Sequence, residues 1–280
     1  MAHHEYHGWI LLVTLPRLLI LPLLCLAMAG AKAQAKTNTE SNDQIYYLIN
    51  QQSAPLEAQN PQDLGVGVLT RVAQVVLANA QMNATFISLP PARFGVPHHL
   101  PTDRPSMHYC SPFFSTSDGE IKLQPAVLHE QFVLLERADN PWQYHGADSL
   151  AGRSLLRLPN YNYPGLEQRF RSGGKHGEIN DITTNGVNSA INMVVAHRAD
   201  AFIEFNSRIR YALRQLALDP AQFSIIPMNE IMPKVPISLC MSPDIRPPAL
   251  ARIRDSYRKL WLVGTLQRLV QASPYFSLPD

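Results

Sequence analysis

The fold class is decided by QIYYLIN at residues 44–50, LTRVAQVVLANA at 69–80 and TFISL at 85–89. The first and third segments are rich in β-branched and aromatic residues and lead into proline-containing loops, which is typical of buried strands. In the middle segment, apolar residues recur at helical spacing at Leu69, Val72, Val76 and Ala80. Because parallel strands joined by a helix need both sheet faces covered, this β-α-β unit predicts an open α/β sheet.

The same alternation of strands and helices continues along the chain. Further strands are expected at residues 132–136, 154–158, 201–205, 223–227 and 235–241. Further helices are expected to begin near Pro164 and to cover residues 187–197, 207–216 and 248–272, with an interruption near Gly264. No low-complexity linker separates these elements, so we expect two lobes that share chain crossings.

Length and composition favour a folded protein that does not bind nucleic acid. The 280 residues are enough for two lobes of ordinary size. A content of 46% hydrophobic and 16% charged residues predicts a chain that buries a core. The formal net charge is only +2, from 24 Lys and Arg against 22 Asp and Glu, so the chain has no electrostatic footprint for nucleic acid.

The N-terminus has the order of a secretory signal peptide. Arg17 precedes an apolar run at residues 18–28, and the small-residue sequence Ala31-Lys32-Ala33 follows. We therefore predict that residues 1–33 are removed after Ala33 and that the protein acts outside the cytoplasm.

Cleavage would leave a polar, flexible leader at residues 34–43. The alternative is an uncleaved anchor, since residues 9–30 are long enough to span a bilayer, although Arg17 interrupts them. Export leaves two cysteines, Cys110 and Cys240, which form either a disulfide or two buried thiols.

Four short motifs follow one another between residues 44 and 276. They are Pro55-Leu56 with Gly65, Leu89-Pro90-Pro91-Ala92-Arg93, Asp148-Ser149-Leu150-Ala151-Gly152-Arg153 and His197-Arg198-Ala199-Asp200-Ala201-Phe202. In this order they resemble the motifs of type II periplasmic solute-binding proteins of family 3, which serve amino-acid ABC importers. The resemblance implies a two-lobed α/β fold of open mixed sheets with helices on both faces. Its first lobe would comprise residues 44–128 and 228–280, and its second lobe residues 129–227.

The resemblance also implies a periplasmic protein that captures a small molecule by lobe closure and passes it to a membrane permease. We expect a monomer without a cofactor or metal ion, with hinge strands near residues 124–128 and 226–232. Both cysteines would belong to the first lobe, which favours a disulfide between them. The sequence has no G-x-S-x-G nucleophile elbow and no H-E-x-x-H zinc helix, so we do not expect an enzyme. The alternatives are a sensing module that signals to a membrane partner, or an enzyme with an unrecognised site.

Ligand contacts are expected at strand ends and in loops that face the cleft. The candidate residues are Gln51, Pro55, Arg93, Phe113, Phe114, Asn160, Tyr161, Tyr163 and Glu204. Arg93 follows a proline pair and is either an anion partner or a surface residue. Glu204 is either a partner for a ligand cation or the partner of Arg208.

One departure from the family concerns its clamp for α-amino acids, in which a T-x-x-R turn supplies an arginine. The corresponding turn at residues 115–120 contains no arginine, and the later acid position falls on Phe205, with Glu204 beside it. Without that arginine, the negative charge of a buried ligand carboxylate would lack a cationic partner, unless Arg93 takes its place. We therefore expect a small polar or anionic solute other than an ordinary amino acid.

Overall fold

The computed structural model describes residues 44–58, 66–90, 93, 105–113, 119–140, 142–159, 161–171 and 179–276. All described residues belong to one compact unit of the chain. The predicted signal peptide and leader lie outside the described residues. Within the described part, no helix is long and apolar enough to cross a membrane.

The first sheet is mixed and has the strand order β2-β1-β3-β11-β4, with β5 also paired to β11. Its strands are β1 (Gln44–Asn50), β2 (Asn83–Leu89), β3 (Ser106–Cys110), β4 (Ile121–Lys122), β5 (Leu128–Glu130) and β11 (Val235–Met241). Strand β1 runs parallel to β2 and β3, whereas β11 runs antiparallel to β3, β4 and β5. Helix α1 (Val68–Asn79) connects β1 to β2, which confirms the predicted β-α-β unit.

The second sheet is also mixed and has the order β10-β6-β9-β7-β8. Its strands are β6 (Phe132–Arg137), β7 (Ser154–Arg157), β8 (Asn180–Thr183), β9 (Ala201–Phe205) and β10 (Phe223–Pro227). Strand β7 is parallel to β8 and β9, and β6 is antiparallel to β9 and β10. The sequence therefore folds into two α/β lobes, each built around one sheet.

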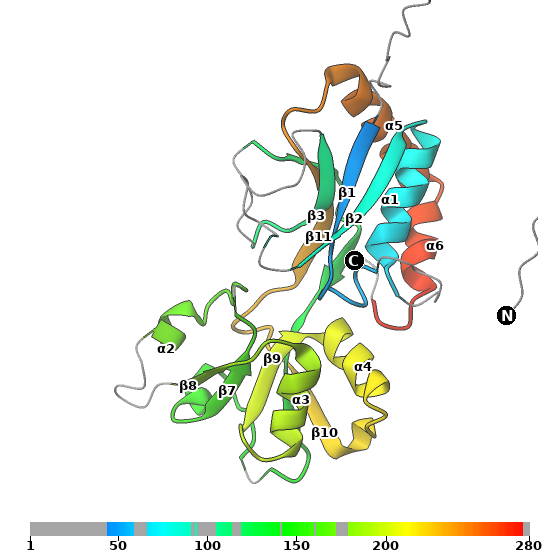
Figure 1. Cartoon of the computed structure of the whole chain (residues 1–280). Helices are drawn as coiled ribbons and strands as arrows, with labels where there is room; N and C mark the ends of the chain where they lie inside the picture. The colour runs from blue at the N-terminus through cyan, green and yellow to red at the C-terminus, as the bar shows by residue number, and fades with distance from the viewer. Residues whose placement is uncertain are drawn as a thin grey trace, which may run out of the picture. The chain divides into compact units, whose positions relative to one another are not determined.

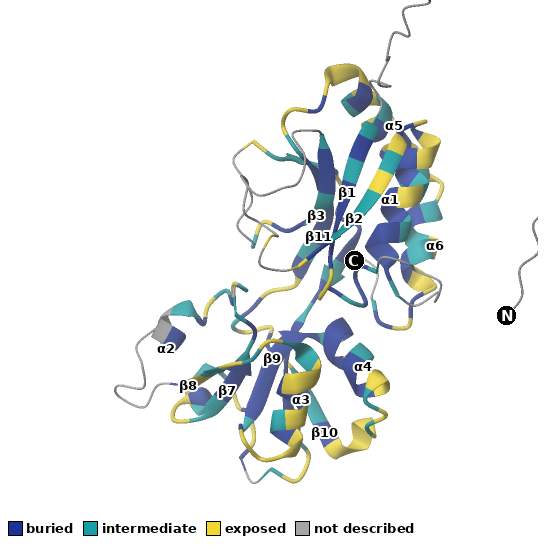
Figure 2. Cartoon of the chain, in the orientation of Figure 1, coloured by how far each residue is buried: buried dark blue, intermediate teal, exposed yellow. Residues whose placement is uncertain are grey.

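Helices cover each sheet with their apolar sides. Helix α1 packs beside α5 (Pro247–Leu262) and α6 (Thr265–Gln271) in the first lobe (Figure 1). In the second lobe, α3 (Val187–Val195) and α4 (Asn206–Gln215) pack on each other and on β6 and β9. Figure 2 shows that the sides of α3 that point away from the sheet are exposed, in keeping with its amphipathic sequence. The structure also describes α2 (Glu167–Arg171) and 3-10 turns at Ala147–Leu150 and Pro220–Gln222.

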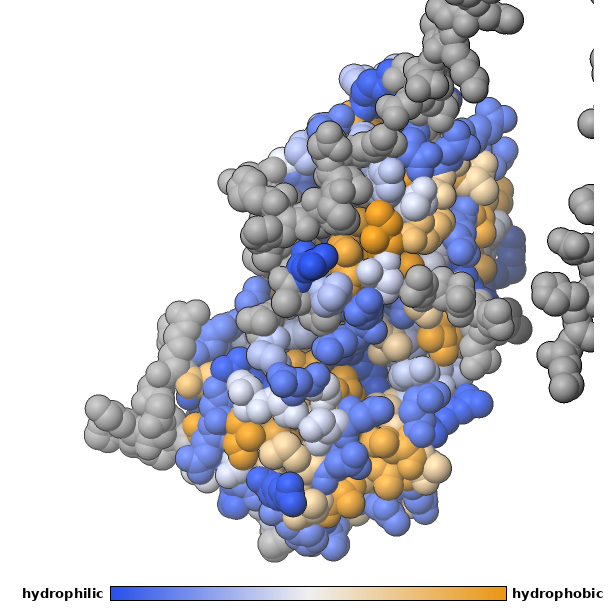
Figure 3. Space-filling model, viewed as in Figure 1, coloured by the Kyte–Doolittle hydropathy of each residue, from blue (hydrophilic) through white to orange (hydrophobic). Residues whose placement is uncertain are grey.

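The predicted interruption near Gly264 separates α5 from α6. Gly264 has φ 73°, a left-handed conformation that glycine adopts without steric cost. The large apolar side chains exposed in the described part are Val195, Leu262 and Val263. Polar and apolar residues are otherwise interspersed on the face shown in Figure 3.

Two chain segments pass between the lobes. One leads from β5 into β6, and the other leads from β10 into β11. These segments pair with each other, because Leu128 lies opposite Ile237 and Glu130 lies opposite Val235. On one side the pairing includes Leu128, the last residue of the first predicted hinge window, and on the other side it begins at Val235, shortly after the second window. The hinge itself remains a prediction.

A disulfide bond joins Cys110, at the end of β3, to Cys240 in β11. The two strands are antiparallel neighbours in the first sheet, and the two Cα atoms are 5.8 Å apart. In the structure these cysteines therefore form a disulfide and not two buried thiols.

Candidate ligand-binding site

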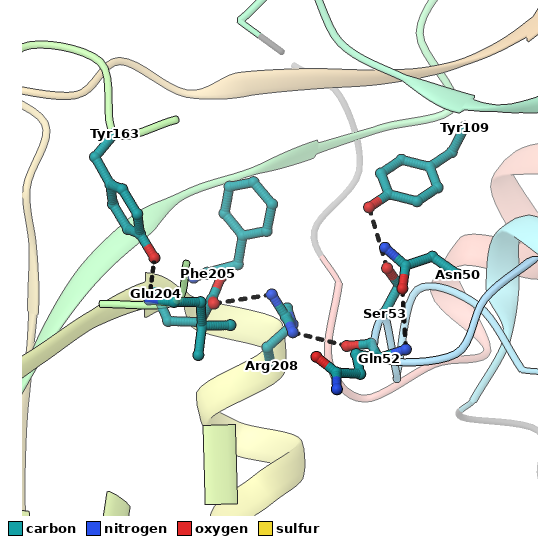
Figure 4. Close-up of polar contacts among 9 residues, drawn as sticks. Asn50, Gln52, Ser53, Tyr109, Tyr163, Glu204, Phe205 and Arg208 are labelled. Carbon is teal, nitrogen blue, oxygen red and sulfur yellow. Dashed lines mark hydrogen bonds and ion pairs between the residues drawn. The ribbon is translucent and has the colours of Figure 1, made fainter. Parts of the chain in front are cut away.

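Arg208 lies between the two lobes at the centre of a polar cluster (Figure 4). It occupies the first turn of α4, which begins directly after β9. Its Nη1 donates to Glu204 Oε2 over 2.8 Å, and its Nη2 donates to the backbone oxygen of Gln52 over 2.7 Å. Gln52 belongs to the loop after β1, so this one side chain contacts elements of both lobes.

Burial sets the electrostatics of this cluster, because Arg208 and Glu204 are only 2% and 1% exposed. Burial raises the pKa of the Glu204 carboxyl, while the Arg208 cation and the Phe205 N–H oppose that shift. Burial alone would lower the pKa of Arg208, but the Glu204 carboxylate and the neighbouring Tyr161, Tyr109 and Tyr163 together outweigh it, so the net shift of this pKa is upward. Arg208 is therefore a permanent cation, and its carboxylate partner is supplied by the protein. This contact favours the salt-bridge alternative for Glu204 over the ligand-cation alternative.

Aromatic residues surround the Arg208 guanidinium. Its carbon lies 5.2 Å from the ring centroid of Tyr161, within the range of a cation–π contact. Tyr109, from β3, has its hydroxyl 3.1 Å from Ser53 Oγ. Tyr163 is buried, accepts the Leu158 N–H at 2.8 Å and packs against the ring of Phe132. Tyr161 is thus the half-buried member of the predicted tyrosine pair, and the position of Tyr163 favours a packing role.

The loop after β1 is held by a buried carboxyl group. Glu57 accepts the Tyr47 hydroxyl at 2.8 Å and the Asn50 N–H at 2.8 Å. Burial raises the pKa of Glu57 to about 8, although these two hydrogen bonds oppose the shift. Asn50 Oδ1 in turn accepts the Gln52 N–H, and the Asn50 carbonyl accepts the Ser53 N–H, which belongs to the same peptide as the Gln52 carbonyl that meets Arg208.

A pocket of about 240 Å³ lies beside this cluster. It is lined by Gln52, Ala54, Asn185, Gly186, Val187, Asn188, Ser189, Arg208, Tyr211 and Ala212. The first two residues come from the loop of the first lobe, and the others come from the start of α3 and from α4. No side chain caps the N-terminus of α3, and its first turn contains no acidic residue. The N–H groups of that turn are therefore available at the edge of the pocket.

The remaining predicted site residues lie in different places. Pro55 is buried next to the pocket-lining Ala54, and Gln51 is exposed beside Gln52. Arg93 is exposed, and its N–H donates to the Pro90 carbonyl, which favours the surface alternative for its side chain. Phe113 is half-buried and packs against the larger core cluster. Phe114 and Asn160 lie outside the described residues, as do residues 115–118 of the turn without arginine.

Sequence reasoning did not select the pocket residues Gln52 and 185–189. Asn185-Gly186 directly before an apolar-periodic helix is a recognisable helix start, and helix N-termini are common anion sites. That signal was available. The approach of Gln52 to Arg208 carries no local signal, because the two residues are 156 positions apart. In the described part, no group of three or more His, Cys, Asp or Glu residues is arranged to hold a metal ion.

Comparison with known proteins identifies the fold. No protein-family model matches the sequence, and no curated protein matches it significantly. The structure resembles one reported for glutathione import through GshT and the cystine ABC importer TcyBC of Streptococcus mutans. This match has a TM-score of 0.63 at 13% identity, over 85% of this chain and 98% of that chain. It also resembles ArtJ, an arginine-, lysine- and histidine-binding protein of Geobacillus stearothermophilus, with a TM-score of 0.59 at 13% identity, over 84% and 96%.

A third similar structure is a histidine kinase sensor domain with similarity to periplasmic binding proteins. Its TM-score is 0.63 at 14% identity, over 84% of this chain and 97% of that chain. The described chain therefore has the two-lobed α/β fold of type II periplasmic binding proteins, as predicted. Proteins of importers and of sensors share this fold, so the fold alone does not choose between them.

Proposed function

We propose that this protein is an extracytoplasmic solute-binding protein that captures a small polar or anionic molecule and delivers it to the permease of an ABC importer. The pocket carries this proposal, because its lining comes from the loop after β1 in one lobe and from α3 and α4 in the other. A molecule that contacts both lobes stabilises their closed arrangement, which is how hinge closure reports binding. A volume of about 240 Å³ suits a solute of few heavy atoms.

The proposal includes the organisation of the chain. Residues 1–33 would be a cleaved signal peptide that directs the protein to the periplasm, and residues 34–43 a leader. The first lobe would comprise residues 44–128 and 228–280, and the second lobe residues 129–227. The protein would work as a monomer that closes about hinge strands near residues 124–128 and 226–232, and it would not catalyse a reaction.

A ligand screen on the chain from residue 34 onward tests the proposal. The panel holds amino acids, organic acids, polyamines, sugars and small phosphorylated compounds, and thermal unfolding is the readout. A ligand at a hundred times its dissociation constant adds about 2.7 kcal/mol of stability, which raises the unfolding temperature by several degrees. If no compound shifts the unfolding temperature, the proposal fails.

Two asparagines on α3 provide a matched pair of variants. Asn188 and Asn192 are both exposed, but only Asn188 lines the pocket. Asn188→Trp is expected to weaken the binding of any compound found in the screen, because the indole blocks the pocket. Asn192→Trp places the same indole one turn further along the helix and should leave binding unchanged. Equal effects of the two variants would place the ligand elsewhere.

The second candidate function is a ligand-sensing module, which the similarity to a histidine kinase sensor domain supports. Capture would be the same, but closure would signal to a membrane protein rather than release a solute to a permease. Genes for a permease and an ATPase beside this gene would favour import. A neighbouring sensor kinase or cyclase gene would favour signalling.

A further inference from the structure

We infer that the N-terminus of α3 and the guanidinium of Arg208 together bind an oxyanion group of the solute, a carboxylate or a phosphoryl group. This inference rests on the proposed function and adds the chemical class of the ligand. It places the anion in the pocket between Gln52 and the first turn of α3.

The first support is the open end of α3. The helix covers nine residues, Val187–Val195, and its first intrahelical bond in the described backbone runs from the Ala190 N–H to the Gly186 carbonyl. The N–H groups of residues 187–189 precede that bond and face the end at which the helix dipole is positive. No capping side chain accepts them, and no acidic residue in the first turn neutralises the dipole. An anion is the ligand that this arrangement binds best.

The second support is independent of the helix. Arg208 also lines the pocket and is only 2% exposed, yet its Nε has no hydrogen-bond partner among the described residues. A buried N–H without an acceptor is costly, and a ligand oxygen in the pocket would remove that cost. The pocket lining contains no Asp or Glu that would repel an anion.

The charge balance limits the ligand further. Glu204 already neutralises Arg208, since the two groups form a buried ion pair at 2.8 Å. The charge of a bound anion would therefore be met by the helix dipole, which is equivalent to about half a positive charge. The amides of Gln52, Asn185 and Asn188 add neutral donors to the lining. The site thus suits one negative group on a small molecule.

Gly186 allows a test that does not disturb the core. Its φ is 173°, an extended conformation open to any residue, and a Cβ added there would meet no atom within 4 Å. In Gly186→Asp, the new carboxylate is expected to cap α3, occupy its free N–H groups and repel an anion. In Gly186→Ala, a methyl group is added without charge or capping.

The experiment measures the affinity of the wild type and both variants for the anionic compounds of the panel, including succinate and inorganic phosphate, at constant ionic strength. We expect an anionic compound to bind the wild type and Gly186→Ala with similar affinity. Binding to Gly186→Asp should be at least ten-fold weaker, while the variant alone unfolds at the same or a higher temperature. Succinate and phosphate separate the carboxylate from the phosphoryl case.

Each other outcome overturns the inference. If only neutral or cationic compounds bind, the ligand class is wrong although the proposed function stands. If an anion binds and Gly186→Asp leaves its affinity unchanged, the anion does not lie at α3, and the proposed function again stands. If no compound of the panel binds, the inference and the proposed function fail together.

Discussion

Arg208 and Glu204 form an ion pair of 2.8 Å across the junction of β9 and α4, and both side chains are almost completely buried. The junction is tight, because β9 ends at Phe205 and α4 begins at Asn206. A spacing of four residues therefore brings the carboxylate of the strand onto the guanidinium of the first helical turn. The same guanidinium reaches the Gln52 carbonyl of the other lobe, so this pair supports both the local fold and the approach of the two lobes.

Replacing only Arg208 should lower the unfolding free energy much more than replacing both Arg208 and Glu204. Arg208→Met leaves the Glu204 carboxylate buried without its cation, which typically costs about 3–5 kcal/mol of unfolding free energy. In the double variant with Glu204→Gln, no charge remains unpaired, so we expect it to be more stable than Arg208→Met alone. Urea unfolding of the wild type, both single variants and the double variant measures this coupling. Additive effects would show that the two groups do not interact.

The buried carboxyl group of Glu57 predicts a pH dependence. Its pKa rises from 4.5 to about 8 in the folded protein because of burial, so the folded state holds an extra proton between these values. Stability should therefore be full below pH 4.5 and fall as the pH rises toward 8, by at most about 1.4 kcal/mol per pH unit for this group. Glu57→Gln keeps a neutral group that can bond the Tyr47 hydroxyl and the Asn50 N–H, and it should reduce the slope.

Unfolding free energies at pH 5, 6, 7 and 8 check this prediction. Burial raises the pKa of Glu130 to about 8 as well, so part of the slope should persist in Glu57→Gln. Glu130→Gln serves as the comparison, and the variant with both substitutions should have the flattest profile. A Glu57→Gln profile parallel to that of the wild type would contradict the assignment.

The disulfide predicts a redox dependence of stability. Cys110 and Cys240 are separated by 130 residues, so their cross-link restricts a long loop of the unfolded chain. Loss of a native disulfide typically costs about 2–5 kcal/mol, and we expect a loss in this range for Cys110→Ser with Cys240→Ser. Unfolding with and without dithiothreitol is the measurement. The reductant should destabilise the wild type and leave the double variant unaffected, whereas no response of the wild type would mean that the bond is absent.

The elements with a strong apolar period were predictable, and the elements without one were not. Gln44–Asn50 and Val187–Val195 were recognised because their apolar patterns reflect burial against a sheet. Strand β8 was missed because it lies at the edge of its sheet, where residues such as Asn180 and Asp181 are exposed. Strand β3 was missed because polar residues, including the buried Ser106, interrupt its pattern. Ser106 is tolerated because its N–H donates to Ser242 Oγ, a contact across 136 residues that no local pattern contains.

The same distinction applies to the candidate site. The Glu204–Arg208 pair was one of two alternatives for Glu204, because a spacing of four residues is a local feature. The pocket was not predicted, since it depends on the loop after β1 meeting the start of α3. Sequence periodicity reports which face of an element is buried, and it does not report which distant loop covers it.

A side chain added at Gly165 would clash with one of the two segments that pass between the lobes. Gly165 lies between β7 and α2 with φ +84°, and a Cβ there would stand 2.8 Å from the backbone oxygen of Ile231. Ile231 belongs to the segment that leads from β10 back to β11. Because a backbone atom cannot move aside as a side chain does, Gly165→Ala must displace this crossing segment or the loop that carries residue 165.

Gly152→Ala is the matched control for this prediction. Gly152 also has a positive φ, +73°, but its added Cβ would meet nothing within 4 Å. Gly152→Ala should lower the unfolding free energy only by the conformational cost of a left-handed alanine, about 1–2 kcal/mol. Gly165→Ala should lower it by this amount and, in addition, by about 1–3 kcal/mol from overpacking. Urea unfolding compares the two variants, and equal losses would mean that the crossing segment yields freely, as a loosely held hinge would.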